Sequence, residues 1–253
     1  MIETARWLRH NRALVALFQQ HAQRKGLRLI EFDTVAHSYS GGELFNDVSL
    51  RLAPGSFHFL TGPSGSGKTT FLKLCYGALV PTSGAVRLFE TDVRQMSRDD
   101  IAMARRRVGV VHQDCKFLDH LTLRENLSLP LTVSGQEALD DDANLKELMG
   151  WVGLTARGDA LPPELSGGER QRAALARALI LSPDVILADE PTGNVDWEMS
   201  QRLLTLLIEL NRMGKTIMIA THDLALIRAA KSQVQARVLR IAGRRLQLAG
   251  ADL

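Results

Sequence analysis

The segment GPSGSGKTT, residues 62–70, constrains the fold of this chain more than any other stretch. It follows the short apolar run SFHFLTG and precedes KTTFLKLCYGAL, a run that is typical of a helix. The spacing Gly62-x-x-x-x-Gly67-Lys68-Thr69 matches the glycine-rich phosphate-binding loop in full. Because that loop needs a strand before it and a helix after it, the sequence predicts an α/β fold.

The residue types of this phosphate loop (residues 62–70) suit the binding of phosphate groups. Its glycines let backbone N–H groups turn toward phosphate oxygens, and the following helix adds partial positive charge at its N-terminus. Lys68 can bring a positive charge to the β- and γ-phosphates, and the Thr69 hydroxyl can ligate Mg²⁺. A plain glycine-rich turn is the alternative interpretation. The residues that we expect to contact the nucleotide here are Gly62, Pro63, Ser64, Gly65, Ser66, Gly67, Lys68, Thr69 and Thr70.

Several other apolar runs end in polar residues. VGVVHQD, DVILADE and TIMIATHD each predict a buried parallel strand whose end delivers side chains to one edge of a sheet. LRLIEFDTV and FNDVSLRL predict the strands of an antiparallel portion near the start. DWEMSQRLLTLLIELNRMG predicts a helix that ends at Gly214. Strands that alternate with helices favour an α/β sheet.

The run VILADE places two carboxylates at the end of a predicted strand. Asp189 follows four apolar residues, which is the position that holds Mg²⁺ through water in phosphate-loop proteins. Glu190 comes next and can polarise the water that attacks a γ-phosphate. Either carboxylate alone could be a helix cap or a surface charge, but the combination with the apolar strand favours the site.

The run ELSGGERQR, residues 164–172, predicts a second glycine-rich helix start. Ser166 and Glu169 have the S-x-x-E spacing of a capping box, and such a start is an anion site. A γ-phosphate wrapped from one side by the phosphate loop still faces water, and hydrolysis needs a second donor set on that face. We expect Ser166, Gly167 and Gly168 to supply it, over the chain's own nucleotide or in trans over that of a second copy.

LSGGERQR, together with the phosphate loop, VILADE and ATHD, resembles the nucleotide-binding domain of the ABC ATPases from about residue 29 onward. The resemblance implies a phosphate-loop NTPase fold over residues 27–253, with a mainly parallel core sheet, an antiparallel β portion and a helical subdomain at approximately 114–180. It also implies ATP hydrolysis with Mg²⁺. On ATP binding two copies would form a head-to-tail homodimer, in which residues 166–168 of each copy close the other's ATP.

The same resemblance implies roles for four further residues. Tyr39 would stack on adenine, and Gln113 would ligate Mg²⁺ and sense a membrane partner. Asp196 would contact the second copy, and His222 would touch the γ-phosphate as a catalytic residue. Three of these residues have a plainer interpretation: a half-buried strand aromatic for Tyr39, a surface amide for Gln113, and a structural histidine for His222.

Within that family, RRRVGVVHQDCKFLDHLTLRENLSLPL and LADEPTGNVD resemble the cell-division ATPases. His112 stands where Phe is more usual, and Cys115–Lys116 departs from the pattern. The resemblance implies an integral membrane partner, gripped beside Gln113 by parts of residues 117–129, and a place on the cytoplasmic face of the cell membrane at the division site. It also implies a motion passed to regulators of cell-wall hydrolysis.

Other functions remain open. DEPTGN is shared with relatives that release lipoproteins or export macrolides, so a transport ATPase is the alternative. A soluble ABC protein that acts on ribosomes or DNA usually has tandem ATPase domains or long insertions, and this chain shows neither. A small-molecule phosphate-loop kinase would have no use for LSGGE.

Basic residues are concentrated at the start of the chain. Residues 1–28 have a net charge of 6 − 1 = +5, and the remainder has 25 − 27 = −2, which argues against a broad nucleic-acid surface. Residues 1–26 predict an amphipathic helix that could lie on an anionic membrane or a partner. A frayed extension, packing on the body or a misassigned start are the alternatives. Its apolar half comprises Trp7, Leu8, Leu14, Val15, Leu17 and Phe18.

Hydropathy and cysteine content bear on the compartment. No apolar run approaches the length that crosses a bilayer, and the start shows no evident signal peptide. Cys75 and Cys115 lie in no metal-binding spacing. Two lone cysteines fit a reducing compartment, so we expect a cytoplasmic location.

Overall fold

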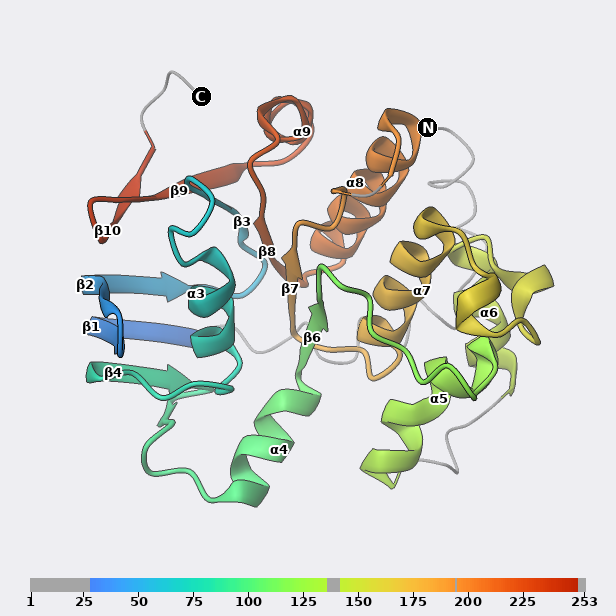
Figure 1. The fold of residues 1–253 in the computed structure, drawn as a ribbon, viewed down its shortest axis with the longest axis horizontal. Coiled ribbons are helices and arrows are strands. Elements are labelled where there is room, and N and C mark those ends of the chain that lie inside the picture. Colours follow the sequence, from blue (N-terminus) through green and yellow to red (C-terminus); the bar gives the residue numbers. More distant parts are fainter. Residues whose placement is uncertain (1–27, 136–141, 194, 250–253) are drawn as a thin grey trace.

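A computed structural model describes residues 28–135, 142–193 and 195–249 of the chain (Figure 1). Its strands are β1 (Ile30–Tyr39), β2 (Gly42–Leu52), β3 (Phe57–Thr61), β4 (Ser83–Leu88), β5 (Thr91–Asp92), β6 (Val108–Val111), β7 (Val185–Asp189), β8 (Thr216–Ala220), β9 (Ala236–Ala242) and β10 (Arg245–Leu248). Its helices are α3 (Lys68–Cys75), α4 (Arg98–Arg106), α5 (Leu123–Ser134), α6 (Asp142–Trp151), α7 (Gly167–Leu179), α8 (Trp197–Arg212) and α9 (Leu224–Lys231), with short 3-10 turns η2 (Thr155–Arg157) and η3 (Pro162–Glu164).

Within the described residues the strands form two sheets. The six-stranded sheet has the order β10-β9-β3-β8-β7-β6, and all its neighbours pair in parallel except β10 with β9. The four-stranded sheet, β2-β1-β4-β5, is antiparallel throughout. The predicted fold, a mainly parallel core sheet with an antiparallel portion near the start, is therefore confirmed.

An aromatic cluster joins the antiparallel sheet to α3, the helix that follows the phosphate loop. The Phe71 ring of α3 is fully buried and stacks on Phe32 of β1, with 4.7 Å between ring centroids and 10° between ring planes. Phe45 of β2 meets the same ring edge-on at 6.1 Å. Stacked and edge-on pairs stabilise beyond the area that they bury, so this cluster fixes where α3 begins.

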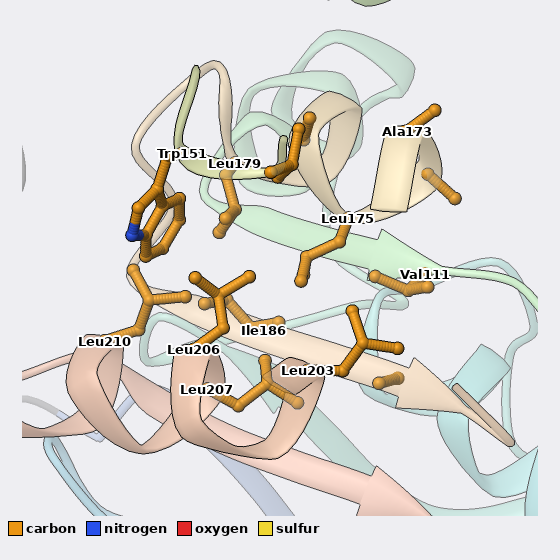
Figure 2. Close-up of a cluster of buried hydrophobic side chains, with 14 of the residues drawn as sticks. Val111, Trp151, Ala173, Leu175, Leu179, Ile186, Leu203, Leu206, Leu207 and Leu210 are labelled. Carbon is orange, nitrogen blue, oxygen red and sulfur yellow. The ribbon is translucent and has the colours of Figure 1, made fainter. Parts of the chain in front are cut away.

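A second part of the core lies between α7, α8 and the parallel sheet. Figure 2 shows Leu175 and Leu179 of α7 and Leu206 of α8 pointing toward one another across Ile186 of β7. Burial on both faces explains why the β7 sequence, VILAD, is almost wholly apolar and does not alternate. The packing holds the last residue of β7, Asp189, at the carboxyl edge of the sheet.

Within the described residues, the predicted helix boundaries are confirmed except at the end of α3. The Ser166–Glu169 capping box is present, and Gly214, at φ 92°, follows the end of α8 in the left-handed region. The run KTTFLKLCYGAL predicted a longer helix than the structure has, because α3 ends at Cys75. Gly77 adopts φ 67°, which turns the chain out of the helix.

The amphipathic helix predicted over residues 1–26 lies outside the described residues. Within the described ranges, no helix combines the length and the apolar content that a bilayer crossing requires. Cys75 and Cys115 are both buried free thiols.

Candidate functional site

The phosphate loop between β3 and α3 folds tightly and leaves no room for a side chain at two of its glycines, Gly62 and Gly67. Gly62, Gly65 and Gly67 have φ values of 155°, 76° and 98°. A Cβ on Gly67 would lie 2.7 Å from a ring carbon of Phe45, and one on Gly62 would lie 2.6 Å from Ser66 Oγ. Only glycine fits these two positions, and its absence of a side chain lets the loop backbone approach a ligand closely.

Lys68 is held at the centre of the loop. Its Nζ donates to the carbonyl oxygens of Gly62 at 3.0 Å and Pro63 at 3.4 Å, and lies 3.8 Å from Glu190 Oε1. The Ser66 hydroxyl is buried in the same loop and has no hydrogen-bond partner among the described residues. A buried polar atom without a partner is unusual, so a held ammonium beside an unused hydroxyl fits the binding of an anion.

The Thr69 hydroxyl and the Asp189 carboxylate meet at the start of α3. Thr69 Oγ1 donates to Asp189 Oδ2 at 2.7 Å. Burial raises the pKa of Asp189 above its usual value and the nearby Glu190 charge adds to this, while the Thr69 hydrogen bond and Lys68 act against it. Hydroxyl and carboxylate oxygens are the ligands that Mg²⁺ takes alongside water and phosphate, so this donor set fits that metal. The part of the chain that the structure describes has no group of three or more His, Cys, Asp or Glu side chains that could hold a metal ion alone.

Glu190 lies between Lys68 and His222. Glu190 Oε1, 3.8 Å from Lys68 Nζ, is also 2.9 Å from His222 Nδ1. The Glu190 backbone adopts φ 46°, a left-handed conformation that costs a non-glycine residue about 1–2 kcal/mol. Its N–H donates to the Ala220 carbonyl at 2.8 Å, which anchors the strained residue to the end of β8. Strain of this kind is stored at functional sites.

Tyr39 lies beside the same loop. Its hydroxyl is 3.3 Å from Thr70 Oγ1, and its ring meets His37 edge-on at 4.9 Å between centroids. The side chain is 49% exposed, so one part of the ring remains accessible. The structure therefore brings Tyr39, Thr70, Lys68, Thr69, Asp189, Glu190 and His222 together around one loop.

Gln113 is exposed and lies just beyond the end of β6. Within the described residues no hydrogen bond joins its amide to Thr69 or Asp189, so its predicted role as a metal ligand stays a prediction.

Tyr76 and His112 lie near Asp189, and neither was predicted as a site residue. Their rings meet edge-on at 6.2 Å between centroids. Burial and then Arg177 lower the pKa of His112, against the raising effect of Asp189. Burial also raises the pKa of Tyr76. Tyr76 follows the end of α3 in no recognisable motif, so the sequence holds no signal that would have indicated it.

The second helix start (residues 166–168) is built as predicted but lies apart from the phosphate loop. Ser166 N donates to Glu169 Oε2 at 2.8 Å, and Glu169 N donates to Ser166 Oγ at 3.3 Å. A Cβ on Gly168 would lie 3.7 Å from Val195, next to Asp196, which accepts from Met199 N at 2.8 Å as the cap of α8. In Figure 1 the strands β6 and β7 stand between α3 and α7.

The chain has clear similarity to known proteins. The family model described as ABC transporter matches residues 45–193. A cell division ATP-binding protein FtsE of Haemophilus influenzae is 39% identical over 201 residues, covering 79% of this chain and 92% of the relative. The FtsE of Bacillus subtilis is 37% identical over 207 residues, covering 81% and 91%.

Solved structures also resemble this chain. A dimeric ATP-binding cassette in a post-hydrolysis state, bound to ADP and Pi, has a TM-score of 0.79 and 30% identity, covering 87% of this chain and 97% of that chain. The dimeric structure of the same bacterial ABC transporter cassette gives a TM-score of 0.78 at 30% identity, with the same coverage.

Proposed function

This chain belongs to the ABC transporter family, and on that premise we propose that it is the ATP-hydrolysing subunit of an FtsE-type cell-division complex. It is an ATPase of the ABC type. Its partner in this proposal is an integral membrane protein of FtsX type, and the work done is the control of septal cell-wall hydrolysis. The similarity to FtsE proteins over about nine-tenths of their length is the observation that carries the proposal.

The chain's own residues would bind ATP from one side. Lys68 and the N–H groups of the phosphate loop would hold the β- and γ-phosphates, and the exposed part of the Tyr39 ring would stack on adenine. Thr69, Gln113 and, through water, Asp189 would hold Mg²⁺. When bound, that ion would neutralise charge on the β- and γ-phosphate oxygens.

Glu190 would act as the base in hydrolysis. Its carboxylate would take a proton from the water whose oxygen attacks the γ-phosphorus, as the bond from that phosphorus to the ADP oxygen breaks. His222 lies 2.9 Å from that carboxylate and would orient it while touching the γ-phosphate. Lys68 would stabilise the charge that develops on the phosphate oxygens.

A second copy would close the site. The separation of residues 166–168 from the phosphate loop within one chain supports a trans arrangement. In it Ser166, Gly167 and Gly168 donate to the γ-phosphate of the other copy. Asp196 would contact that copy beside them. The similarity to dimeric cassettes adds further support for a homodimer formed on ATP binding.

Opening and closing of this dimer would move the membrane partner. We assign the contact with the membrane partner to residues 117–129 beside Gln113. These residues belong to a helical subdomain at approximately 114–180 that contains α5, α6 and α7. The chain would then lie on the cytoplasmic face of the cell membrane, at the division site. Residues 1–26 would add contact with anionic lipid headgroups, and nucleic acid has no part in the proposal.

Copurification tests the division role against the alternative, an ATPase for lipoprotein release or macrolide export. The tagged full-length chain is expressed in its own cells and the membrane proteins that it retains in mild detergent are identified by mass spectrometry. The proposal expects an FtsX-type protein in stoichiometric amount. A lipoprotein-releasing or export permease in its place would contradict the division role and leave the ATPase assignment intact.

A further inference from the structure

The second helix start carries a negative charge of its own. Glu169 is in the first turn of α7, and its Oε2 accepts the Ser166 N–H at 2.8 Å. The Gly167 and Gly168 N–H groups, as the first two of the helix, have no intrahelical acceptor and make no hydrogen bond within the described residues. A phosphate received there would therefore meet two free donors and, within the same first turn, a carboxylate.

Arg157 of η2 forms an ion pair with this carboxylate. Its Nε lies 3.1 Å from Glu169 Oε1, the oxygen that the Ser166 N–H does not use. Its Nη2 donates to the Glu164 carbonyl at 2.6 Å, which ties the guanidinium to the segment that leads into α7. Arg172 also acts on the Glu169 charge, but the Arg172 guanidinium points to Met199, with Nη1 3.3 Å from Sδ.

We propose that Arg157 is a positioning residue of the trans phosphate site, which cancels the Glu169 charge so that residues 166–168 can receive the γ-phosphate of a second copy. This inference rests on the proposed function of those residues. The argument is electrostatic: an uncompensated carboxylate repels an incoming phosphate and competes with it for the positive end of the helix. Glu169 is retained in the site as the capping-box partner of Ser166.

Charge compensation and a purely structural role predict different outcomes for a paired substitution. Arg157→Met removes both the positive charge and the hydrogen bond from Arg157 Nη2 to the Glu164 carbonyl. Glu169→Gln removes the opposing charge, and the amide oxygen of Gln can still accept the Ser166 N–H. If the Arg157 charge matters, Glu169→Gln rescues Arg157→Met. If only the hydrogen bond to the Glu164 carbonyl matters, Glu169→Gln does not rescue Arg157→Met.

The experiment uses the full chain carrying Glu190→Gln, so that bound ATP persists, and measures dimer formation against MgATP concentration by analytical ultracentrifugation. Arg157→Met should raise the ATP concentration at half-maximal dimer about tenfold. Adding Glu169→Gln should restore it to within about twofold. A fluorescent ATP analogue should bind the monomer equally in all variants. The matched control is Arg51→Met, which removes an arginine paired with Glu31 at 2.7 Å, away from α7, and should leave dimer formation unchanged.

Several results would overturn the inference. An Arg157→Met variant that dimerises at the same ATP concentration as the parent chain would do so. A double variant that still needs the higher ATP concentration would do so too. If Arg157→Met does not fold, Glu169→Gln alone decides, because it should dimerise at equal or lower ATP concentration and a higher requirement contradicts the proposal. Ser166→Arg serves as the reference for the proposed function. If it dimerises normally with ATP, the trans site itself is wrong, whereas a blocked Ser166→Arg with a normal Arg157→Met removes only the role of Arg157.

Discussion

His222 Nδ1 lies 2.9 Å from Glu190 Oε1, a contact between two residues that are 32 positions apart and come from the ends of neighbouring strands, β8 and β7. The same carboxylate oxygen is 3.8 Å from Lys68 Nζ. The proposed base is thus held between a cation of the phosphate loop and an imidazole that is largely exposed to solvent.

Glu190→Gln should separate ATP binding from hydrolysis. The amide keeps the shape and a hydrogen bond to His222 but cannot take a proton, so turnover should fall by a factor on the order of a hundred to ten thousand. ATP binding should persist and trap the closed dimer. Steady-state phosphate release and gel filtration with MgATP measure the two effects. Turnover at the wild-type rate would remove Glu190 from the role of base.

Phe71→Ala should destabilise the fold through α3. Phe71 is fully buried and stacks on Phe32, and removing a buried phenyl ring leaves a cavity that costs about 3–5 kcal/mol of unfolding free energy. Urea denaturation followed by circular dichroism measures the loss. Val133→Ala is the control: that side chain is 77% exposed, and its truncation should change the unfolding free energy by less than about 0.5 kcal/mol. Equal stabilities of the two variants would contradict the role of the aromatic cluster.

His58 should make stability depend on pH. Burial, and then Arg237, lower the pKa of His58 to about 4 in the folded chain. In the unfolded chain histidine has a pKa near 6.5. Between pH 4 and pH 6.5 the unfolded state therefore binds a proton that the folded state does not bind. The free energy of unfolding is therefore largest above the pKa of the unfolded chain. It decreases as the pH is lowered, by about 3 kcal/mol between pH 7 and pH 4.

Paired urea titrations of wild type and His58→Phe at pH 7 and pH 4 isolate this effect, because the other titrating groups are common to both chains. The difference in unfolding free energy between the two chains should shift by about 3 kcal/mol in favour of the variant at the lower pH. Two pH profiles that run parallel would show that His58 is protonated as readily in the folded as in the unfolded chain.

Deleting residues 1–26 should weaken the binding of the chain to anionic vesicles. The deletion removes basic residues and the apolar half that would enter the lipid interface, and surface attraction of this kind is screened by salt. Cosedimentation with phosphatidylglycerol vesicles, with phosphatidylcholine vesicles as the control, measures the change. Unchanged binding would favour packing of this segment on the body or a frayed extension.

The sequence predicted those site positions at which a local motif requires one backbone conformation. Gly62, Gly67 and Lys68 define a loop of one geometry. Asp189 ends a strand whose apolar sequence requires burial, and Glu190 follows it, so the approach of these two carboxylates to the loop follows from parallel strands that end at one edge of the sheet. The Ser166–Glu169 capping box is likewise a local pattern.

Contacts between elements that are distant in the sequence could not be predicted in this way. The Arg157–Glu169 ion pair depends on how η2 packs beside α7, and the proximity of Tyr76 and His112 to Asp189 depends on the path of the chain after α3 and β6. The sequence overestimated the length of α3 because the apolar pattern typical of a helix continues past Gly77, although the left-handed backbone of Gly77 cannot continue the helix.

Mixing two inactive variants tests the central claim, that each site is completed by a second copy. Lys68→Ala lacks a phosphate loop able to bind ATP, and Ser166→Arg lacks a working second helix start, so each alone should have lost ATPase activity. In a mixed dimer one site combines the intact phosphate loop of one copy with the intact residues 166–168 of the other. A 1:1 mixture should therefore regain about a quarter of wild-type activity, for random pairing in a two-fold dimer. A mixture as inactive as its two components would contradict the claim.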